Sequence, residues 1–432
     1  MPPTKIAIVG LGTVGSGVAR LLMESGDRLA RHAGRELVLA QVVVKDPCKQ
    51  RQIRVSESIV SADLKRITSD PEIKVVALLI GGLEPARTIA LALLDAGKDI
   101  VTANKALLAA HGAELFDRAR KLGRSIAFEA SVAGGIPIIA NISQCLSANQ
   151  IESIHAILNG TSNYILTQME AQGTSYADAV REAQRLGYAE TDPTMDVDGS
   201  DAAQKLAILA HLAFGARADW QAIPRQGIDT LDVADLRYAR ELGYRIKLLA
   251  VAQLTPVGLE LHVSPTLVRL GTPLAEVRGA YNAISVVGDA VGRVFFSGLG
   301  AGQMPTASAV MADLIDTVVG RAAITFRTLQ LWSDSAERVA VSDHRNVADR
   351  YYLRFNVADQ PSVLAEIAGQ LGKENISIAS VIQHEAEDAG QGVVPLVIMT
   401  HNTTEGAVCR AVEAIDRLAF MRGPSARMRV RD

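Results

Sequence analysis

The sequence predicts an α/β protein of two or three domains, and three observations support this prediction. Its 432 residues exceed what one compact hydrophobic core can hold. Short apolar runs alternate with helical patterns in the first third of the chain, as in a parallel sheet covered by helices. Toward the C-terminus the pattern changes to the order β-α-β-β-α-β, which is typical of a separate small module.

The composition excludes several classes of partner. Hydrophobic residues make up 48% and charged residues 21% of the chain, and the formal net charge is −3. This balance provides no basic surface, so we expect a small-molecule substrate and no nucleic-acid or membrane partner. The chain enters a strand without an apolar leader and contains no run of about 18 apolar residues. We therefore expect a cytoplasmic protein.

Three cysteines are spread widely along the chain: Cys48, Cys145 and Cys409. They show no metal-ligand spacing, so we interpret them as reduced thiols. A catalytic cysteine is the alternative, but no motif places a histidine beside any of them.

Residues 1–134 are predicted to form the first domain. Lys5–Val9 is its first strand, Val14–Met23 has apolar residues at helical spacing, and Glu36–Val44 is a second strand. A long helix at about 306–331 is expected to return to this domain. The remaining predicted elements are strands Ile73–Ile80, Asp99–Thr102 and Ser125–Glu129, and helix Pro85–Ala96, which Gly97 ends.

Residues 135–305 are predicted to form an α+β domain for substrate binding and dimerisation. Ile246–Leu254 and Leu259–Val263 flank a four-residue turn, and the second run alternates with a period of two. We therefore expect an antiparallel pair with one face exposed to solvent. The other predicted elements are strands Asn282–Val287 and Arg293–Ser297, and helices Tyr176–Leu186 and Asp201–Phe214.

A polar linker, 332–349, is predicted to lead into a ferredoxin-like module, 350–432. Its predicted elements are strands Tyr351–Val357, Ile376–Ile382, Val393–Thr400 and Arg427–Val430, and helices 362–371 and 405–418.

A glycine-rich loop lies between the first strand and the first helix. Gly10, Gly12 and Gly15, with Thr13 and Val14, form the pattern Gly-x-Gly-x-x-Gly. In this context the pattern predicts a Rossmann dinucleotide site, with the pyrophosphate at the helix N-terminus. The alternative is a glycine-rich turn without a ligand.

The end of the second strand bears on the choice between NADP and NAD. An acid there would accept the ribose hydroxyls of NAD, and a cation would bind the 2′-phosphate of NADP. Lys45 and Asp46 supply both kinds of charge. Lys45 favours NADP, whereas the alternative is two solvated surface charges.

An acid and a lysine four residues apart are candidates for chemistry. Asp201 and Lys205 share one face of a predicted helix, which by itself is typical of a surface salt bridge. The apolar run Leu206–Phe214 that follows predicts instead a largely buried helix.

Several segments resemble homoserine dehydrogenases. They are Asn159–Leu166 (NGTSNYIL), Gly187–Lys205 and Gly298–Val310 (GLGAGQMPTASAV), together with the glycine loop and Thr102-Ala103-Asn104-Lys105. These segments span nearly residues 5–320 in the order that the family has. The resemblance implies a reversible, NAD(P)-dependent interconversion of L-homoserine and L-aspartate 4-semialdehyde in threonine and methionine biosynthesis. Because no kinase domain precedes the dehydrogenase, we expect the monofunctional form.

The resemblance also implies roles for individual residues. Lys205 would donate the proton to the aldehyde oxygen, and Lys105 would be a second lysine beside the nicotinamide, with the choice between them left open. A cationic acid suits this chemistry because hydride attack on a carbonyl builds negative charge on oxygen. The implied substrate ligands are Glu190, Asp196, Asp201, Asn159 and Thr161, and Gly302 is added to the cofactor site. Helix capping is the alternative for Asn159 and Thr161.

A further loop, EASVAGGI, resembles the segment with which the family holds a monovalent cation. The implied ligands of a sodium ion are Glu129, Val132, Gly134 and Ile136. A glycine-rich hinge between domains is the alternative.

The C-terminal module resembles an ACT domain, which in many biosynthetic enzymes binds the end product of the pathway. The match includes Asp359-Gln360-Pro361 and Asn375-Ile376-Ser377-Ile378, but Ser362 replaces the usual glycine. The resemblance to an ACT domain implies threonine as an effector. The alternative is that the module serves only in dimerisation. We expect a homodimer or homotetramer.

Two other functions remain open. Another Rossmann reductase of a small carbonyl acid would share the glycine loop but would not need the spacing from Glu190 to Lys205. A metabolite sensor would bind the same ligands without turnover.

Overall fold

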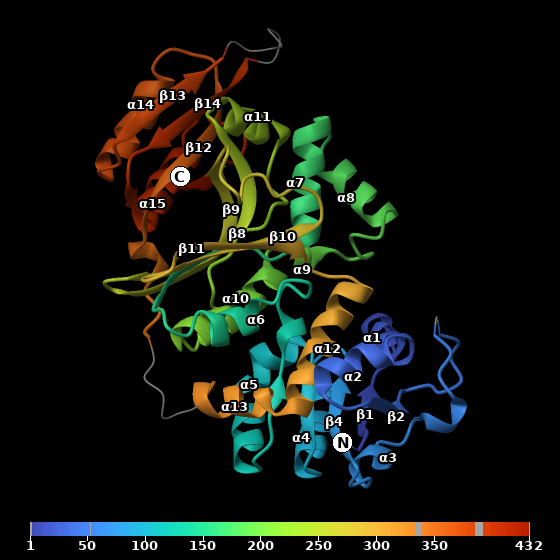
Figure 1. The fold of residues 1–432 in the computed structure, drawn as a ribbon. Coiled ribbons are helices and arrows are strands. Elements are labelled where there is room, and N and C mark those ends of the chain that lie inside the picture. Colours follow the sequence, from blue (N-terminus) through green and yellow to red (C-terminus); the bar gives the residue numbers. More distant parts are fainter. Residues whose placement is uncertain (1, 52, 333–338, 385–391, 432) are drawn as a thin grey trace. The chain divides into compact units, whose positions relative to one another are not determined.

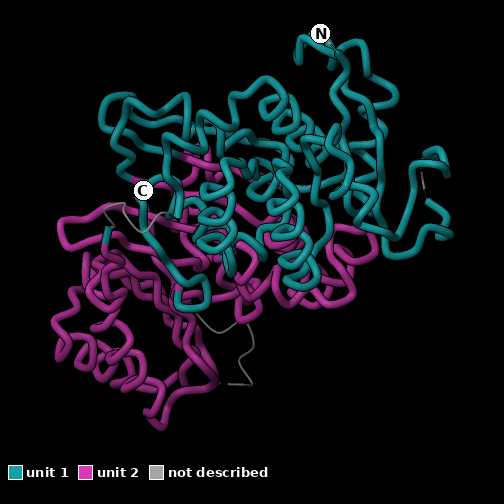
Figure 2. The backbone as a smooth tube through the Cα atoms, turned by 90° about the horizontal axis from the view of Figure 1, so that it is seen from below, with its two compact units in different colours: residues 1–152, 204–222, 286–339 teal, residues 153–203, 223–285, 340–432 magenta. Residues whose placement is uncertain are grey.

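The computed structural model describes residues 2–51, 53–332, 339–384 and 392–431. Its packing divides the chain into two compact units, which Figure 2 distinguishes by colour. The first unit contains residues 1–152, 204–222 and 286–339, and the second contains 153–203, 223–285 and 340–432. Part of the predicted linker, 333–338, falls outside the described residues.

The sheet of the first unit is parallel and has the strand order β3-β2-β1-β4-β5-β6. This order, with a glycine loop after β1, defines a Rossmann fold and confirms the prediction. Strands β1 and β4 are almost completely buried, as expected for a parallel sheet covered on both faces. The strands are β1 (Thr4–Val9), β2 (Leu37–Val43), β3 (Val60–Ser61), β4 (Ile73–Leu78), β5 (Asp99–Thr102) and β6 (Ile126–Ala127).

Helices of the first unit pack around this sheet, and α12 lies beside α1 (Figure 1). At their closest approach, a Cβ added to Gly17 would lie 2.9 Å from the Cβ of Ala307, so only glycine allows this contact. The helices are α1 (Thr13–Glu24), α2 (Gly26–Ala33), α3 (Lys65–Thr68), α4 (Ala86–Asp95), α5 (Lys105–Lys121), α6 (Ile138–Ala140), α12 (Gln303–Val319) and α13 (Arg321–Leu329). Strand β11 (Gly292–Leu299) also belongs here, and α10 (Ser200–Phe214) has residues of both units.

Two predictions for this unit need correction. The single helix expected at about 306–331 is two helices, because Gly320 adopts a φ of 90° that ends α12 at Val319. The strand expected at Ser125–Glu129 is only two residues long, since a 3₁₀ turn begins at Glu129.

The second unit is built on a mixed sheet in which β10-β7-β8-β9-β16-β12-β14-β13 are successive neighbours. Strands β8 and β9 form the predicted antiparallel hairpin, and β16 pairs in parallel with β9. The strands are β7 (Ile151–Ile157), β8 (Tyr244–Thr255), β9 (Gly258–Arg269), β10 (Tyr281–Gly288), β12 (Ala348–Ala358), β13 (Ile378–Gln383), β14 (Val393–Thr400), β15 (Thr403–Thr404) and β16 (Ala426–Arg431).

The prediction that one face of this hairpin is exposed to solvent is wrong. Glu260 and His262 on β9 are only 4% and 2% exposed. Arginines of β16 cover and neutralise this face: Arg429 and Arg431 both pair with Glu260, at 3.2 and 3.1 Å. A buried acid of this kind is tolerated only when it is paired.

The C-terminal module has the predicted order of elements, with the short β15 added. Its own core packs Phe355, Ile367, Ile398 and Val408 between the sheet and two helices. Its sheet continues that of residues 244–269 through the pairing of β16 with β9. The helices of the second unit are α7 (Gly160–Gln172), α8 (Tyr176–Arg185), α9 (Thr194–Val197), α11 (Val233–Glu241), α14 (Val363–Lys373) and α15 (Glu405–Asp416). Within the part of the chain that the structure describes, no helix has the length and apolar character of a membrane span.

Candidate active site

The glycine loop of the first unit has the geometry of a dinucleotide site. Gly10 adopts a φ of 99°, and an added Cβ would lie 2.7 Å from the Leu79 carbonyl oxygen. A Cβ on Gly15 would lie 2.1 Å from the Gly10 oxygen, whereas one on Gly12 would meet no atom within 4 Å. Gly10 and Gly15 are therefore required by the backbone, and Gly12 leaves an open approach to the N-terminus of α1, where Thr13 and Val14 begin the helix.

Two other predicted cofactor residues lie near the edges of this unit. Lys45 follows β2 and is exposed, as is Asp46, which accepts a hydrogen bond from the Cys48 amide at 2.9 Å. Gly302 precedes α12 with a φ of 130°, so this helix begins at a glycine just as α1 does.

Lys105 is the first residue of α5 and is half-buried. Asn104 caps this helix by accepting a hydrogen bond from the Leu107 amide at 3.0 Å. The Asn104 amide also donates to the carbonyls of Ile80 and Gly82, at 3.0 and 2.7 Å. Lys105 is thereby fixed at the carboxyl edge of the sheet, where Rossmann folds bind their ligands.

Lys205 is half-buried on α10, one turn after Asp201. Both candidate lysines, Lys105 and Lys205, belong to the first unit, as does the glycine loop.

Four predicted substrate residues gather at the N-terminus of α7 in the second unit. The Asn159 amide donates to Asp196 at 2.7 Å and to Asp201 at 2.9 Å. Its oxygen caps α7 by accepting from the Ser162 amide at 2.8 Å, so helix capping and side-chain clustering coexist. The Thr161 hydroxyl donates to the carbonyl of Tyr188 at 2.7 Å. This arrangement places two carboxylates on one amide, which suits a substrate that carries an ammonium group.

Glu190 is not part of this cluster. It is exposed, and its carbonyl accepts a hydrogen bond from the Gln184 side chain at 3.2 Å. The sequence pattern placed Glu190 with Asp196 and Asp201, and the structure brings only the two aspartates onto Asn159.

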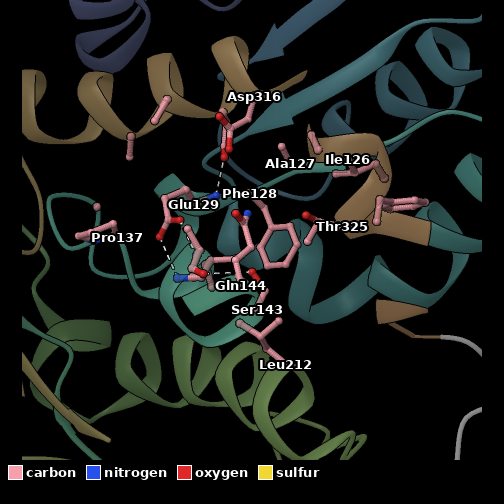
Figure 3. Close-up of a pocket in the computed structure, with 18 of the residues that line it drawn as sticks. Ile126, Ala127, Phe128, Glu129, Pro137, Ser143, Gln144, Leu212, Asp316 and Thr325 are labelled. Atoms are coloured by element: carbon pink, nitrogen blue, oxygen red, sulfur yellow. Dashed lines mark hydrogen bonds between the residues drawn. The ribbon is translucent and has the colours of Figure 1, made fainter. Parts of the chain in front are cut away.

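A cavity of about 560 Å³ lies within the first unit and is lined by the candidate cation residue Glu129 (Figure 3). Phe128, Pro137 and Phe326 contribute apolar walls, and Asp313 and Asp316 are two further acids in the lining. Of the described residues that line it, none belongs to the glycine loop.

Glu129 itself is buried, and its two carboxylate oxygens accept the amides of Ile139 and Ala140 at 2.8 Å each. Burial raises the pKa of Glu129 to about 7, although these two hydrogen bonds act to lower it. Its backbone amide donates to Asp313 at 2.8 Å, and burial raises the pKa of Asp313 as well. The other candidate cation ligands, Val132, Gly134 and Ile136, are buried in the same loop. No cluster of three His, Cys, Asp or Glu side chains suited to a metal occurs among the described residues.

Lys247 and Asp313 are two charged residues of interest that sequence reasoning did not identify. Lys247 lies in the apolar strand β8 and is 1% exposed, and Asp313 lies in the apolar helix α12. The detectable signal was the presence of charges within largely apolar elements, Arg245 and Lys247 in β8 and Asp313 and Asp316 in α12, because such a charge is buried only where it has a partner.

A Rossmann unit with a dinucleotide loop, joined to a unit that gathers acids around one amide, defines a nicotinamide-dependent dehydrogenase of a small molecule. Two family models match the chain: "Homoserine dehydrogenase, NAD binding domain" over residues 10–129 and "Homoserine dehydrogenase" over 137–315. A homoserine dehydrogenase of Pseudomonas aeruginosa is 44% identical, with 100% of this chain and 99% of the relative covered. The chain belongs to the homoserine dehydrogenase family and is an NAD(P)-dependent oxidoreductase.

Solved structures agree with this assignment. The crystal structure of a homoserine dehydrogenase from Thiobacillus denitrificans has a TM-score of 0.91 and 40% identity, covering 100% of this chain and 98% of that one. A hyperthermophilic archaeal homoserine dehydrogenase in complex with NADPH has a TM-score of 0.61 and 26% identity, covering 74% and 98%.

Proposed function

We propose that this chain interconverts L-homoserine and L-aspartate 4-semialdehyde with NAD(P), within threonine and methionine biosynthesis. The observation that carries the proposal is the cluster of Asn159, Asp196 and Asp201, because two carboxylates held on one amide offer a site for the α-ammonium group. Family membership supports the same reaction. The alternative of another small-carbonyl reductase gives no reason for this cluster.

The proposed chemistry assigns the reacting proton to a lysine. When the aldehyde carbon accepts hydride, the carbonyl π electrons would move to oxygen, and the Lys205 ammonium would donate the proton that this oxygen takes up. Lys105, at the carboxyl edge of the nucleotide-binding sheet, would stabilise the same developing charge. Bound NAD(P) would supply the hydride.

The choice of cofactor depends on the end of β2. Lys45 is exposed there and available to a 2′-phosphate, which favours NADP, while Asp46 already accepts a backbone amide. The archaeal relative with NADPH supports use of this cofactor by the family.

A sodium ion bound by Glu129 and the carbonyls of Val132, Gly134 and Ile136 is a further proposal. Each carboxylate oxygen of Glu129 keeps a lone pair beyond its amide hydrogen bond, so a cation would fit there and favour the ionised form. Binding predicts a higher melting temperature in sodium chloride than in choline chloride at equal ionic strength and pH 8. Equal melting temperatures would contradict it.

The C-terminal module is proposed to be an ACT domain that binds threonine. A cavity of about 430 Å³ supports this proposal, since Asp359, Gln360, Ser362 and Gln383 line it with polar groups suited to an amino acid.

Lys205→Met tests the proposed reaction. We expect kcat for aspartate semialdehyde reduction to fall about a thousandfold, because a general acid contributes on that order, while NADPH still binds by fluorescence. Lys121→Met, at an exposed position on α5, is the matched control and should retain full activity. Retention of most turnover by Lys205→Met would exclude Lys205 as the acid. A wild-type protein that binds NADPH without turnover would instead support the sensor alternative.

A further inference from the structure

Lys247 is a buried lysine of the second unit that no step of the proposed chemistry uses. It lies on β8, and its amine donates to the Asn163 side-chain oxygen at 2.9 Å and to the carbonyl of Val277. We propose that Lys247 is a positioning residue for the amino-acid substrate, which acts through Asn163 and segment 277–282 to hold the first turn of α7 in place.

The first step is the orientation of Asn163. Its amide nitrogen lies within hydrogen-bond distance of the carbonyls of Val277, Gly279 and Tyr281, at 3.2, 2.9 and 3.1 Å. The Lys247 amine donates both to Asn163 and to the Val277 carbonyl, and this donation requires the amide oxygen of Asn163 on the side of the lysine. Lys247 thereby directs the amide nitrogen of Asn163 toward the three carbonyls and gathers segment 277–282.

The second step is the contact between this segment and the start of α7. A Cβ on Gly160 would lie 2.6 Å from the carbonyl oxygen of Ala280, so the two backbones touch. The Asn282 amide donates to the carbonyl of Leu158 at 3.0 Å. The Thr167 hydroxyl accepts the Gly279 amide at 3.0 Å and donates to the Asn163 carbonyl at 2.6 Å. Segment 277–282 therefore supports the turn that contains Asn159.

The third step is the opposite side of that turn, where Asn159 holds Asp196 and Asp201 at 2.7 and 2.9 Å. Because binding groups must be held within about 0.5 Å of their productive geometry, a displaced first turn weakens substrate binding. The contacts run without a break from Lys247 to the two carboxylates, all within the second unit.

Stability alone gives no reason for a lysine at this position. A methionine of similar length would pack in the same apolar strand without the cost of burying an amine. Burial, and then the neighbouring Arg245, lowers the pKa of Lys247 to about 7, so the fold bears a cost to keep this amine. Orientation of Asn163 is the benefit that the geometry offers.

The test compares two buried lysines. Lys98 is 2% exposed, and its amine donates to the carbonyls of Asp70 and Ile73 at 2.5 and 2.8 Å, at the amino edge of the nucleotide-binding sheet. We expect Lys247→Met to raise the KM for L-homoserine by about tenfold or more with the KM for NADP⁺ within about twofold of wild type, because a binding site has been displaced. Lys98→Met should leave both values within about twofold.

A milder variant keeps the proposal testable if Lys247→Met does not fold. Thr167→Val removes one hydroxyl from the same set of contacts and should raise the KM for homoserine by about threefold or more, again without effect on NADP⁺. Unchanged homoserine KM in the folded variants, or an equal loss in all kinetic constants, would overturn the proposal.

The positioning role of Lys247 rests on the proposed substrate site. The variant Asp201→Asn distinguishes a failure of the positioning role from a failure of the substrate site. If Asp201→Asn raises the homoserine KM and Lys247→Met and Thr167→Val do not, only the positioning role fails. If Asp201→Asn also leaves this KM unchanged, the substrate site itself fails.

Discussion

Ser362 has a left-handed backbone, with a φ of 74°, immediately before α14. Glycine adopts this conformation without strain, whereas other residues lose about 1 kcal/mol or more. Serine at position 362 therefore adds strain to this loop. The loop backbone still has the conformation that glycine would favour.

Ser362→Gly is expected to stabilise the protein by about 0.5–1 kcal/mol, because relief of this strain exceeds the extra chain entropy of glycine. Urea unfolding measures the change. Ser377→Gly is the control, since Ser377 is exposed and is not among the residues with a positive φ. It should destabilise by a similar amount, and the same sign for both variants would contradict the argument.

A second prediction for a single residue concerns Lys247 and the dependence of the free energy of unfolding on pH. Its pKa is about 7 in the folded protein and about 10.5 in the unfolded chain, with Arg245, Arg278, Glu170 and Glu276 as its charged neighbours. Between pH 7 and 10.5 the unfolded state binds more protons than the folded state, so the free energy of unfolding rises with pH by up to about 1.4 kcal/mol per unit.

Replacement of the amine should remove this contribution. We expect the free energy of unfolding of Lys247→Met to rise less between pH 7.5 and 9.5 than that of wild type, as measured by urea titration at each pH. Lys373→Met, at an exposed position on α14, should follow wild type. Parallel curves for wild type and Lys247→Met would show that this lysine is charged in the fold.

Among the elements of the second unit, α11 and β12 are joined by a buried ion pair. Asp235 on α11 is fully buried, and its carboxylate accepts two hydrogen bonds from Arg354 on β12, at 2.6 and 2.8 Å. The Tyr352 hydroxyl adds a third at 3.0 Å. The C-terminal module is therefore anchored by charge to residues 233–241.

Asp235→Ala should destabilise the second unit by about 3–5 kcal/mol, because it leaves the Arg354 guanidinium buried without its carboxylate. The double variant Asp235→Ala with Arg354→Met should recover part of the loss, since neither charge remains. Urea midpoints for wild type, Asp235→Ala, Arg354→Met and the double variant form the cycle. Arg410→Ala, which breaks the exposed pair with Glu374, should cost less than about 1 kcal/mol. Additive losses in the cycle would contradict a direct pair.

Elements with a strong local signal were predictable, and those that depend on distant partners were not. The buried strands β1, β4 and β5 appear in the sequence as runs of Val and Ile between helical patterns. Helix α7 was expected only through the capping residues at its start, and its length was not predicted, because it is buried on almost every side and so lacks an amphipathic period. The buried face of β9 was misjudged because its partner β16 comes more than 150 residues later in the chain.

The candidate site shows the same division. Motifs identified Asn159, Asp196 and Asp201, which the structure brings together. Lys247 and Asn163 support them through backbone carbonyls of segment 277–282, which no motif marks.

On the scale of the whole molecule, the substrate cluster and the C-terminal module belong to one compact unit. The sheet runs on from β9 into β16, and Arg429 links Glu260 to Asp349 and Glu405 at 3.2, 3.6 and 2.9 Å. Removal of residues 345–432 would uncover β9 and leave Glu260 and His262 without these cations. In a truncated chain, a loss of regulation could therefore not be distinguished from a loss of folding. A single substitution is the better test of regulation by threonine.

Asp359→Asn removes the charge in the C-terminal cavity that would bind the ammonium group of threonine. If threonine acts there, the variant should need at least about tenfold more threonine for half-inhibition, with basal kcat unchanged, because allosteric coupling is commonly about 1–3 kcal/mol. Glu366→Gln, exposed on α14 and not part of the cavity lining, should be inhibited like wild type. Equal inhibition of all three proteins would place the effector elsewhere. Absence of both inhibition and a threonine-dependent melting shift in wild type would leave dimerisation as the role of the module.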